Sequence, residues 1–263
     1  MSKDFDNKNE WALVLGGSTG LGLASAKKLA EHGMNIIVIH RDRKSELHQI
    51  EKDFLEIKNM GVKFLSYNTD LLKSEKRQEI VSHIDKGIEK GKIKTLIHSI
   101  AKGNLKPMTS AEHVLKNDDF HLTIDAMAIS LYDWVKSVFE ANFFAQDARV
   151  ISFTSEGNTK AWKNYAAVSA AKVALEAITR SIALEFAPYG IKANCLQPGA
   201  VDTKSLRMIP GHEKIIAHSI ERNPFNRITT PKDVANVVYL LCKDEASWIN
   251  GCILPVNGGE HLN

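Results

Sequence analysis

The chain has 263 residues, of which 44% are hydrophobic, and a formal net charge of +3. No Pro/Gly/Ser-rich linker, repeat or low-complexity tract divides it, so we predict a single domain over residues 1–263. A charge this small argues against a nucleic-acid-binding surface, which needs clustered Lys and Arg. No apolar run approaches the roughly 20 residues that cross a membrane.

The start of the chain and its cysteines indicate where the protein resides. Residues 1–10 are polar and lack the apolar core of a secretory signal, so we expect a flexible arm there. The three cysteines, Cys195, Cys242 and Cys252, form no CxxC pair and fit free thiols in a cytoplasmic protein. The ten histidines show no metal-ligand spacing, so no catalytic metal is predicted.

Short apolar runs alternate with amphipathic stretches along the chain. Such runs predict strands buried on both faces, and the stretches between them predict covering helices. The expected strands are 11–15, 35–40, 62–67, 94–98, 149–153, 191–196 and 252–256, and the main expected helices are 21–32, 45–60, 74–90, 120–141, 165–187 and 232–242. We therefore predict an α/β fold with a single doubly wound, Rossmann-like parallel sheet, whose ligands sit beyond the carboxyl ends of the strands.

The first expected strand runs into a glycine-rich turn over residues 16–22. Glycine lets the backbone approach a ligand closely, and the N-terminus of the next helix presents free N–H groups to a phosphate. An ordinary tight turn would use the same residues, but its place after the first strand favours a dinucleotide site. The candidate cofactor contacts in this turn are Gly16, Ser18, Thr19, Gly20, Leu21 and Gly22.

The end of the second expected strand bears on the choice of cofactor. An acidic residue at this position binds the ribose 2′-OH of NAD, whereas a nearby Arg accommodates the 2′-phosphate of NADP. Here His40 is followed at once by Arg41, so we favour NADPH. Asp42, one residue later, keeps NADH open, and a solvated charged loop is the structural alternative.

A tyrosine and a lysine form the candidate catalytic pair. Tyr165 and Lys172 stand seven residues apart in an expected Ala-rich helix, so they share one face two turns apart. A phenol can donate a proton, and a nearby ammonium lowers its pKa. Together with the glycine-rich turn, the pair predicts a nicotinamide-dependent reductase.

At this point the chain resembles the short-chain dehydrogenase/reductase family from about residue 11 to residue 259. The marks are the glycine-rich turn, Asp70-Leu71, the Tyr165/Lys172 pair and Pro198-Gly199. The resemblance implies that Asp70 and Leu71 flank the adenine and that Thr203 lies near the nicotinamide carboxamide. It also implies cofactor contacts from Ser99, Ile100 and Ala101 and from Lys172 to the nicotinamide ribose, and a homo-oligomer, either dimer or tetramer.

Two departures from the usual family pattern resemble the enoyl-[acyl-carrier-protein] reductase branch. The usual spacing is Tyr-x3-Lys, but Val168 stands there and the tyrosine comes three residues earlier. The fourth strand ends in His98-Ser99-Ile100-Ala101 instead of Asn-Asn-Ala-Gly. Against this branch, the glycine-rich turn has the ordinary spacing, and Ser155 stands where ketone-reducing members place their carbonyl-binding serine. Such hybrids resemble the NADPH-dependent minority type of enoyl reductase.

The spacing offers a geometric reason for enoyl reduction. Lys172 keeps its family position while Tyr165 moves one helical turn, about 4.5 Å. In an enoyl thioester the hydride lands on Cβ, and the oxygen that gains charge is two bonds further away than in a ketone. Tyr165 would donate to that oxygen, Lys172 would position the cofactor, and Ser155 would help hold the carbonyl. Asp125 is a candidate for a water relay, with a satisfied polar core residue as the alternative.

The sequence therefore predicts an NADPH-dependent reductase of trans-2-enoyl thioesters in fatty-acid synthesis. A 3-ketoacyl or other carbonyl reductase of the same family is the first alternative, and a non-catalytic dinucleotide-binding module is the second. Residues 200–225 are expected to form a lid over the substrate. Its basic residues Lys204, Arg207, Lys214 and Arg222 would meet an acidic acyl carrier protein, or form a solvated face.

Overall fold

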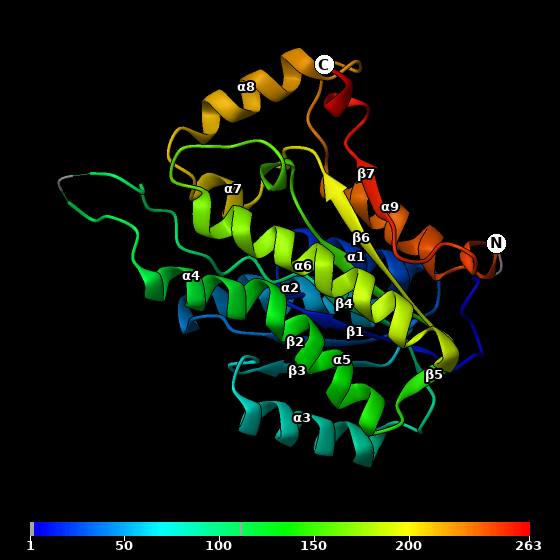
Figure 1. Cartoon of the computed structure of the whole chain (residues 1–263). Coiled ribbons are helices and arrows are strands. Elements are labelled where there is room, and N and C mark those ends of the chain that lie inside the picture. Colours follow the sequence, from blue (N-terminus) through cyan, green and yellow to red (C-terminus); the bar gives the residue numbers. More distant parts are fainter. Residues whose placement is uncertain (1–2, 111) are drawn as a thin grey trace.

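The computed structural model describes residues 3–110 and 112–263, and its centre is a seven-stranded sheet (Figure 1). The strand order is β3-β2-β1-β4-β5-β6-β7, and all neighbouring strands pair in parallel. The order reverses between β1 and β4, and this is where open α/β sheets bind ligands. The predicted doubly wound parallel α/β fold is thereby confirmed.

The elements follow the expected alternation. The strands are β1 Trp11–Leu15, β2 Asn35–His40, β3 Phe64–Asn68, β4 Ile93–His98, β5 Phe144–Phe153, β6 Ile191–Pro198 and β7 Ile253–Val256. The helices are α1 Gly20–Glu31, α2 Lys44–Asn59, α3 Ser74–Gly87, α4 Asn117–Ile124, α5 Ser130–Glu140, α6 Ala166–Glu185, α7 Lys204–Arg207, α8 His212–Arg222 and α9 Pro231–Cys242. No helix among the described residues is both long and apolar enough to cross a membrane.

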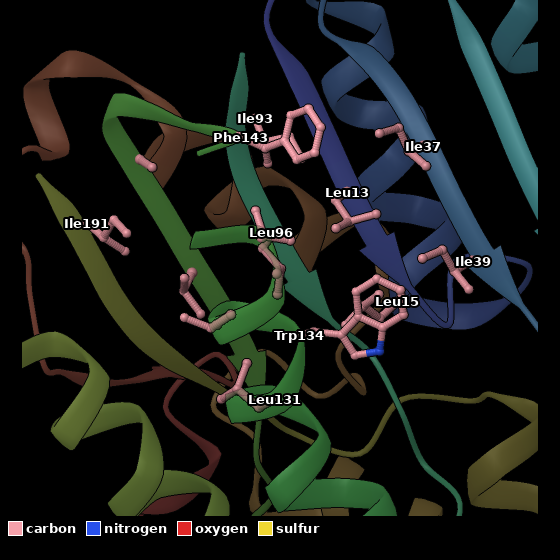
Figure 2. Packing of buried hydrophobic residues seen from close by; sticks show 14 of the residues in the cluster. Leu13, Leu15, Ile37, Ile39, Ile93, Leu96, Leu131, Trp134, Phe143 and Ile191 are labelled. Carbon is pink, nitrogen blue, oxygen red and sulfur yellow. The ribbon is translucent and has the colours of Figure 1, made fainter. Parts of the chain in front are cut away.

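Each face of the sheet is covered by helices, because alternate residues of the buried strands point to opposite sides. On β1, Leu13 and Leu15 join a core with residues of α3, α5 and α6. Figure 2 shows Trp134 of α5 lying against this face of the strands. Val14 belongs to the other core, with residues of α1, α2 and α9. The continuous apolar runs in the sequence thus reflect burial on both faces.

Two elements differ from the sequence prediction. The long helix expected over 120–141 is present as continuous helical backbone from 117 to 140, but its middle, Asp125–Ile129, is a π-helical segment between α4 and α5. Such segments carry an extra residue per turn and are frequent at functional sites, and apolar periodicity does not reveal them. The strand expected over 149–153 begins earlier, at Phe144. The sequence did not indicate this start because Gln146 and Asp147 interrupt the apolar pattern in the first half of the strand.

The segment before β1 is packed against the domain. Phe5 is 2% exposed and packs edge-on against Tyr239 of α9, and its backbone N–H donates to the His32 carbonyl at the end of α1. Tyr239 also donates a hydrogen bond to Asp4. The expected flexible arm is therefore anchored over its described part, residues 3–10.

Candidate active site

A cavity of about 750 Å³ opens beyond the carboxyl ends of β1, β4, β5 and β6. It brings together candidate residues from segments far apart in the sequence. Those that line it are Gly16, Ser18, Thr19, Gly20, Leu21, Arg41, Asp70, Leu71, Ser99, Ile100, Ala101, Ser155, Tyr165, Lys172 and Thr203. Of the predicted cofactor contacts, only Gly22 does not line it.

The glycine-rich turn is shaped for close backbone approach. Gly16 has φ +80°, and a Cβ there would fall 2.4 Å from the Ser99 carbonyl oxygen of the neighbouring strand end. Gly22 is buried in α1, where a Cβ would fall 2.4 Å from the Gly16 carbonyl. Gly22 thus allows α1 to pack onto the turn instead of facing the ligand. The start of α1 lies at the cavity, since Thr19, Gly20 and Leu21 line it, and the N-terminus of a helix after such a turn is a site where a pyrophosphate can bind.

At the end of β2, Arg41 and Asp42 each pair with a neighbouring side chain. The Arg41 guanidinium lies 3.1 Å from Asp70 and its side chain is 60% exposed. The Asp42 carboxylate is instead turned toward His40, 2.8 Å from its ring nitrogen, and its backbone N–H donates to Asn68. Arg41 and Asp42 both line the cavity, with Arg41 paired to Asp70 and Asp42 to His40, and of the two the Arg41 side chain is the more exposed.

Tyr165 lies at the N-cap of α6. Its hydroxyl oxygen is 3.3 Å from Ser155 Oγ, so the two hydroxyls form one hydrogen-bonded pair. Lys172, two turns later, donates from Nζ to the Phe153 carbonyl at the end of β5, at 2.6 Å. The structure thus places all three predicted catalytic residues at the strand β5 end of the cavity.

Burial governs the ionisation of this pair. Burial raises the pKa of the Tyr165 phenol, and the hydrogen bond from Ser155 only partly offsets this. Burial lowers the pKa of Lys172 to about 8, against the opposing effects of Cys195 and Glu176. The expectation that Lys172 lowers the tyrosine pKa is wrong for this structure, because Tyr165 is dominated by desolvation and its bond to Ser155. Tyr165 is therefore a neutral hydrogen-bond donor at physiological pH.

Two polar candidates lie outside the reacting centre. Asp125 is exposed at the start of the π-helical segment and does not line the cavity, so it is not a buried core residue and lies away from the site where a relay would act. His98 is buried, and its Nε2 lies 2.8 Å from Ser130 Oγ. Burial and the nearby Lys172 lower the pKa of His98 to about 3, so it is neutral and structural.

Apolar side chains form a wall beside Tyr165 that no sequence motif predicts. Its side chains form a cluster with Tyr165 and come from the loop after β4, the π-helical segment, the loop before α6, α6 itself and the lid: Leu105, Met127, Trp162, Val168 and Ile209. The Trp162 ring lies 5.3 Å from that of Tyr165. No local motif marks these residues, because they converge only in the folded chain. The wall suits an apolar substrate portion next to the tyrosine.

The segment expected as a lid holds α7 and α8 and contributes residues from Ala200 to Ser219 to the cavity lining. Figure 1 shows α8 lying over the end of β6. Its last residue, Arg222, donates to Glu156 at 2.7 Å and to Glu260 at 2.8 Å. Three of the four basic residues considered for a carrier protein are paired within the chain: Lys204 with Glu46, Arg207 with Asp202, and Arg222 with these two glutamates.

Comparison with known proteins identifies the family. A family model described as Enoyl-(Acyl carrier protein) reductase matches residues 16–261. The chain belongs to the short-chain dehydrogenase/reductase family. It is an NAD(P)-dependent oxidoreductase, and the glycine-rich turn and the Tyr165/Lys172 pair both lie within the matched range.

Relatives of this short-chain dehydrogenase/reductase have varied names. The chain is 26% identical to the probable 2,4-dienoyl-CoA reductase of Bacillus subtilis (strain 168), covering 95% of this chain and 96% of that protein. It is 29% identical to the 2-dehydro-3-deoxy-D-gluconate 5-dehydrogenase of Formosa agariphila, covering 98% and 96%. The structure of enoyl-[acyl-carrier-protein] reductase (NADH) from Aquifex aeolicus VF5 superposes with a TM-score of 0.84 at 22% identity over 98% of both chains, which shows a shared fold.

Proposed function

We propose that the protein reduces the carbon–carbon double bond of a trans-2-enoyl thioester with NADPH. The observation that carries the proposal is the place of Tyr165. It stands at the N-cap of α6, one turn before Val168, which occupies the family's usual tyrosine position. Its hydroxyl is thereby suited to an oxygen two bonds further from the hydride acceptor than in a ketone. The apolar wall formed by Met127, Trp162 and Ile209 suits the acyl chain.

The residues present fit a dinucleotide. Gly16 and Gly20 adopt positive φ, so the turn leaves the start of α1 open to a pyrophosphate. Arg41 supports a 2′-phosphate, because it is exposed at the cavity edge while the Asp42 carboxylate is held by His40. Lys172 spends one of its three N–H donors on the Phe153 carbonyl, which leaves donors for a ribose hydroxyl.

The chain's own residues would bind the oxygen that gains charge. When bound, the reduced nicotinamide supplies the hydride. Tyr165 donates a hydrogen bond to the thioester oxygen, where negative charge develops, and Ser155 supports the tyrosine from 3.3 Å. The enolate then takes up a proton from solvent at Cα, which completes the reduction. Because the Tyr165 pKa is raised, the group stays protonated and ready to donate. The apolar wall would pack against the acyl chain beside Tyr165.

One observation favours the carbonyl-reductase alternative. The Ser155–Tyr165 hydroxyl pair also suits a ketone oxygen, which both groups would contact at once. The experiment that decides follows NADPH consumption by the purified protein with a trans-2-enoyl thioester and, separately, with a 3-ketoacyl thioester. We expect turnover of the enoyl substrate. Turnover of the ketoacyl substrate alone would overturn the proposal in favour of carbonyl reduction.

We also propose that the acyl group arrives on an acidic carrier protein or coenzyme A, and that the protein is a homo-oligomer. Lys214 of α8 supports a carrier contact only weakly, since its basic neighbours pair within the chain. The oligomer is supported by Leu240, 54% exposed, and Trp248, 98% exposed, which leave apolar surface near the end of α9. Light scattering of the purified protein in solution gives the mass that tests this.

A further inference from the structure

A buried carboxylate, Glu176, lies on the same helix as Lys172. Glu176 is on α6, one turn after Lys172, and is 7% exposed. Its Oε1 accepts two hydrogen bonds, from Thr154 Oγ1 and from Asn158 Nδ2, both at 2.5 Å. Burying a carboxylate is costly unless it is well bonded, so a group in this place indicates a specific role.

The two donors to Glu176 bracket Ser155. Thr154 precedes it, and Asn158 ends the short 3-10 turn that follows it. Asn158 is itself held by Gln197 of β6, whose side chain donates to Asn158 Oδ1 at 3.2 Å. Glu176 therefore fixes both ends of the segment that carries Ser155, and this segment sets the 3.3 Å contact between Ser155 and Tyr165.

Glu176 also supplies negative charge near Lys172. The titratable groups around Lys172 are Glu176 on α6, His98 on β4 and Cys195 on β6, with Tyr165 two turns away at the N-cap of α6. Tyr165 is a neutral phenol, His98 is neutral, and burial raises the pKa of the Cys195 thiol to about 11, so it too is neutral near pH 8. The standing negative charge in this group is therefore that of Glu176.

We propose that Glu176 is a positioning residue that holds the Ser155 segment against Tyr165 and keeps Lys172 in its ammonium form. This rests on the proposed function only in taking Tyr165, Ser155 and Lys172 as the working groups. The sign follows from the charges. Burial lowers the pKa of Lys172 to about 8 and Glu176 opposes that shift, so losing the carboxylate charge lowers the pKa further.

Two conservative variants separate the two parts of the proposal. Glu176→Gln keeps the size and an oxygen acceptor but removes the charge. Thr154→Val keeps the size but removes one donor to the carboxylate. Glu185→Gln, on the exposed last residue of the same helix, is the matched control for charge. Circular dichroism and thermal melts establish that all three variants fold.

The first readout is NADPH affinity as a function of pH, followed by nucleotide fluorescence, which requires no turnover. In the wild type and in Glu185→Gln, affinity should fall as the pH rises through about 8, the pKa of Lys172. In Glu176→Gln the fall should begin about one pH unit lower. A binding curve for Glu176→Gln that overlays the wild type would overturn the charge role.

The second readout is kcat with whichever thioester the wild type turns over. Thr154→Val should lower kcat about 10-fold with unchanged NADPH affinity, because Ser155 is displaced while Lys172 keeps its charge partner. An unchanged kcat would overturn the positioning role. A wild type that reduces only the ketoacyl thioester would instead contradict the proposed function, and the Glu176 test would then be run on that substrate.

Discussion

The ring of Tyr165 is held in a narrow slot at the start of α6. A Cβ on Gly157 would fall 2.4 Å from Tyr165 Cε1, so only glycine at that place lets the ring lie where it does. Trp162 closes the slot from the loop before the helix. The phenol is thus fixed one turn before Val168 by its neighbours, which makes the reach of this single side chain testable.

Moving the tyrosine should abolish enoyl reduction. Tyr165→Phe is expected to lower kcat with a trans-2-enoyl thioester by about 100-fold or more, since the donor to the oxygen is lost. Adding Val168→Tyr should not restore it, because that hydroxyl lies one turn too close to the hydride acceptor. Tyr189→Phe, at an exposed position, is the matched control. A double variant with wild-type kcat would disprove the geometric argument.

Arg41 should decide between the two nucleotides. Arg41→Ala removes the guanidinium that faces the cavity, so the KM for NADPH should rise by about 10- to 100-fold, as expected for a lost charge-assisted bond. The KM for NADH should change little, because NADH lacks the 2′-phosphate. Steady-state kinetics with both nucleotides give the answer, with the exposed Arg180→Ala as control. Equal changes for both nucleotides would argue against the assignment.

Among the elements, the lid helix α8 is tied to the catalytic loop by its last residue. Arg222 contacts Glu156, the residue after Ser155, and Glu260 near the C-terminus, and all three side chains are mostly buried. Burial raises the pKa of Glu156, but Arg222 and Lys160 outweigh this and hold it below its usual value. The stabilisation from this pairing is therefore present above the ordinary carboxyl pKa and is lost as the pH falls through the lowered one.

Removing the Arg222 ion pairs should destabilise the packing of α8. Arg222→Met leaves Glu260 buried without its counter-ion, so we expect a lower melting temperature and faster amide hydrogen exchange across 212–222. The KM for the acyl substrate should rise several-fold, since α8 forms part of the cavity wall. Arg207→Met, which breaks an exposed pair with Asp202, should leave exchange and KM unchanged. Unchanged exchange in Arg222→Met would show that α8 is held by other contacts.

For the whole molecule, a cluster of charged side chains links the central strands at the end of the sheet opposite the cavity. Asp147, near the start of β5, accepts hydrogen bonds from Lys94 of β4 at 2.9 Å, from Arg149 and from Lys192 of β6 at 2.5 Å. Lys94 and Arg149 are almost fully buried. Burial raises the pKa of Asp147, but these three cations outweigh it and hold the pKa well below its usual range. One carboxylate thus joins three adjacent strands.

Removing that carboxylate should destabilise the fold without touching the chemistry. Asp147→Asn leaves buried Arg149 without its counter-ion and leaves Lys94 with only the exposed Asp244 at 3.7 Å, so the melting temperature at neutral pH should fall by more than about 5 °C, even with solvent screening at this partly exposed site. The difference from the wild type should stay constant from pH 7 down to the ordinary carboxyl pKa and begin to shrink only below it, since the pKa of Asp147 is lowered. Calorimetry from pH 7 to pH 3 measures this, with exposed Asp85→Asn as control. An equal melting temperature at pH 7 would contradict it.

The sheet was predictable because its signal is local: apolar runs such as 11–15 and 35–40 must be strands in a chain of this pattern. Most candidate site residues were predictable because they follow strand ends, which meet at one edge. The apolar wall around Met127, the packing of Phe5 and the pairing of Arg222 were not. Their partners lie tens of residues away, and no short pattern encodes such contacts.

The π-helical segment between α4 and α5 carries one residue more than a regular helix would need. Met127 within it forms part of the cavity wall. Deleting a single codon between 125 and 129 would let the two helices merge, and each preceding residue would turn by about 100° about the axis. We therefore expect a one-residue deletion here to move Met127 out of its place in the cavity wall and so to change which substrates fit.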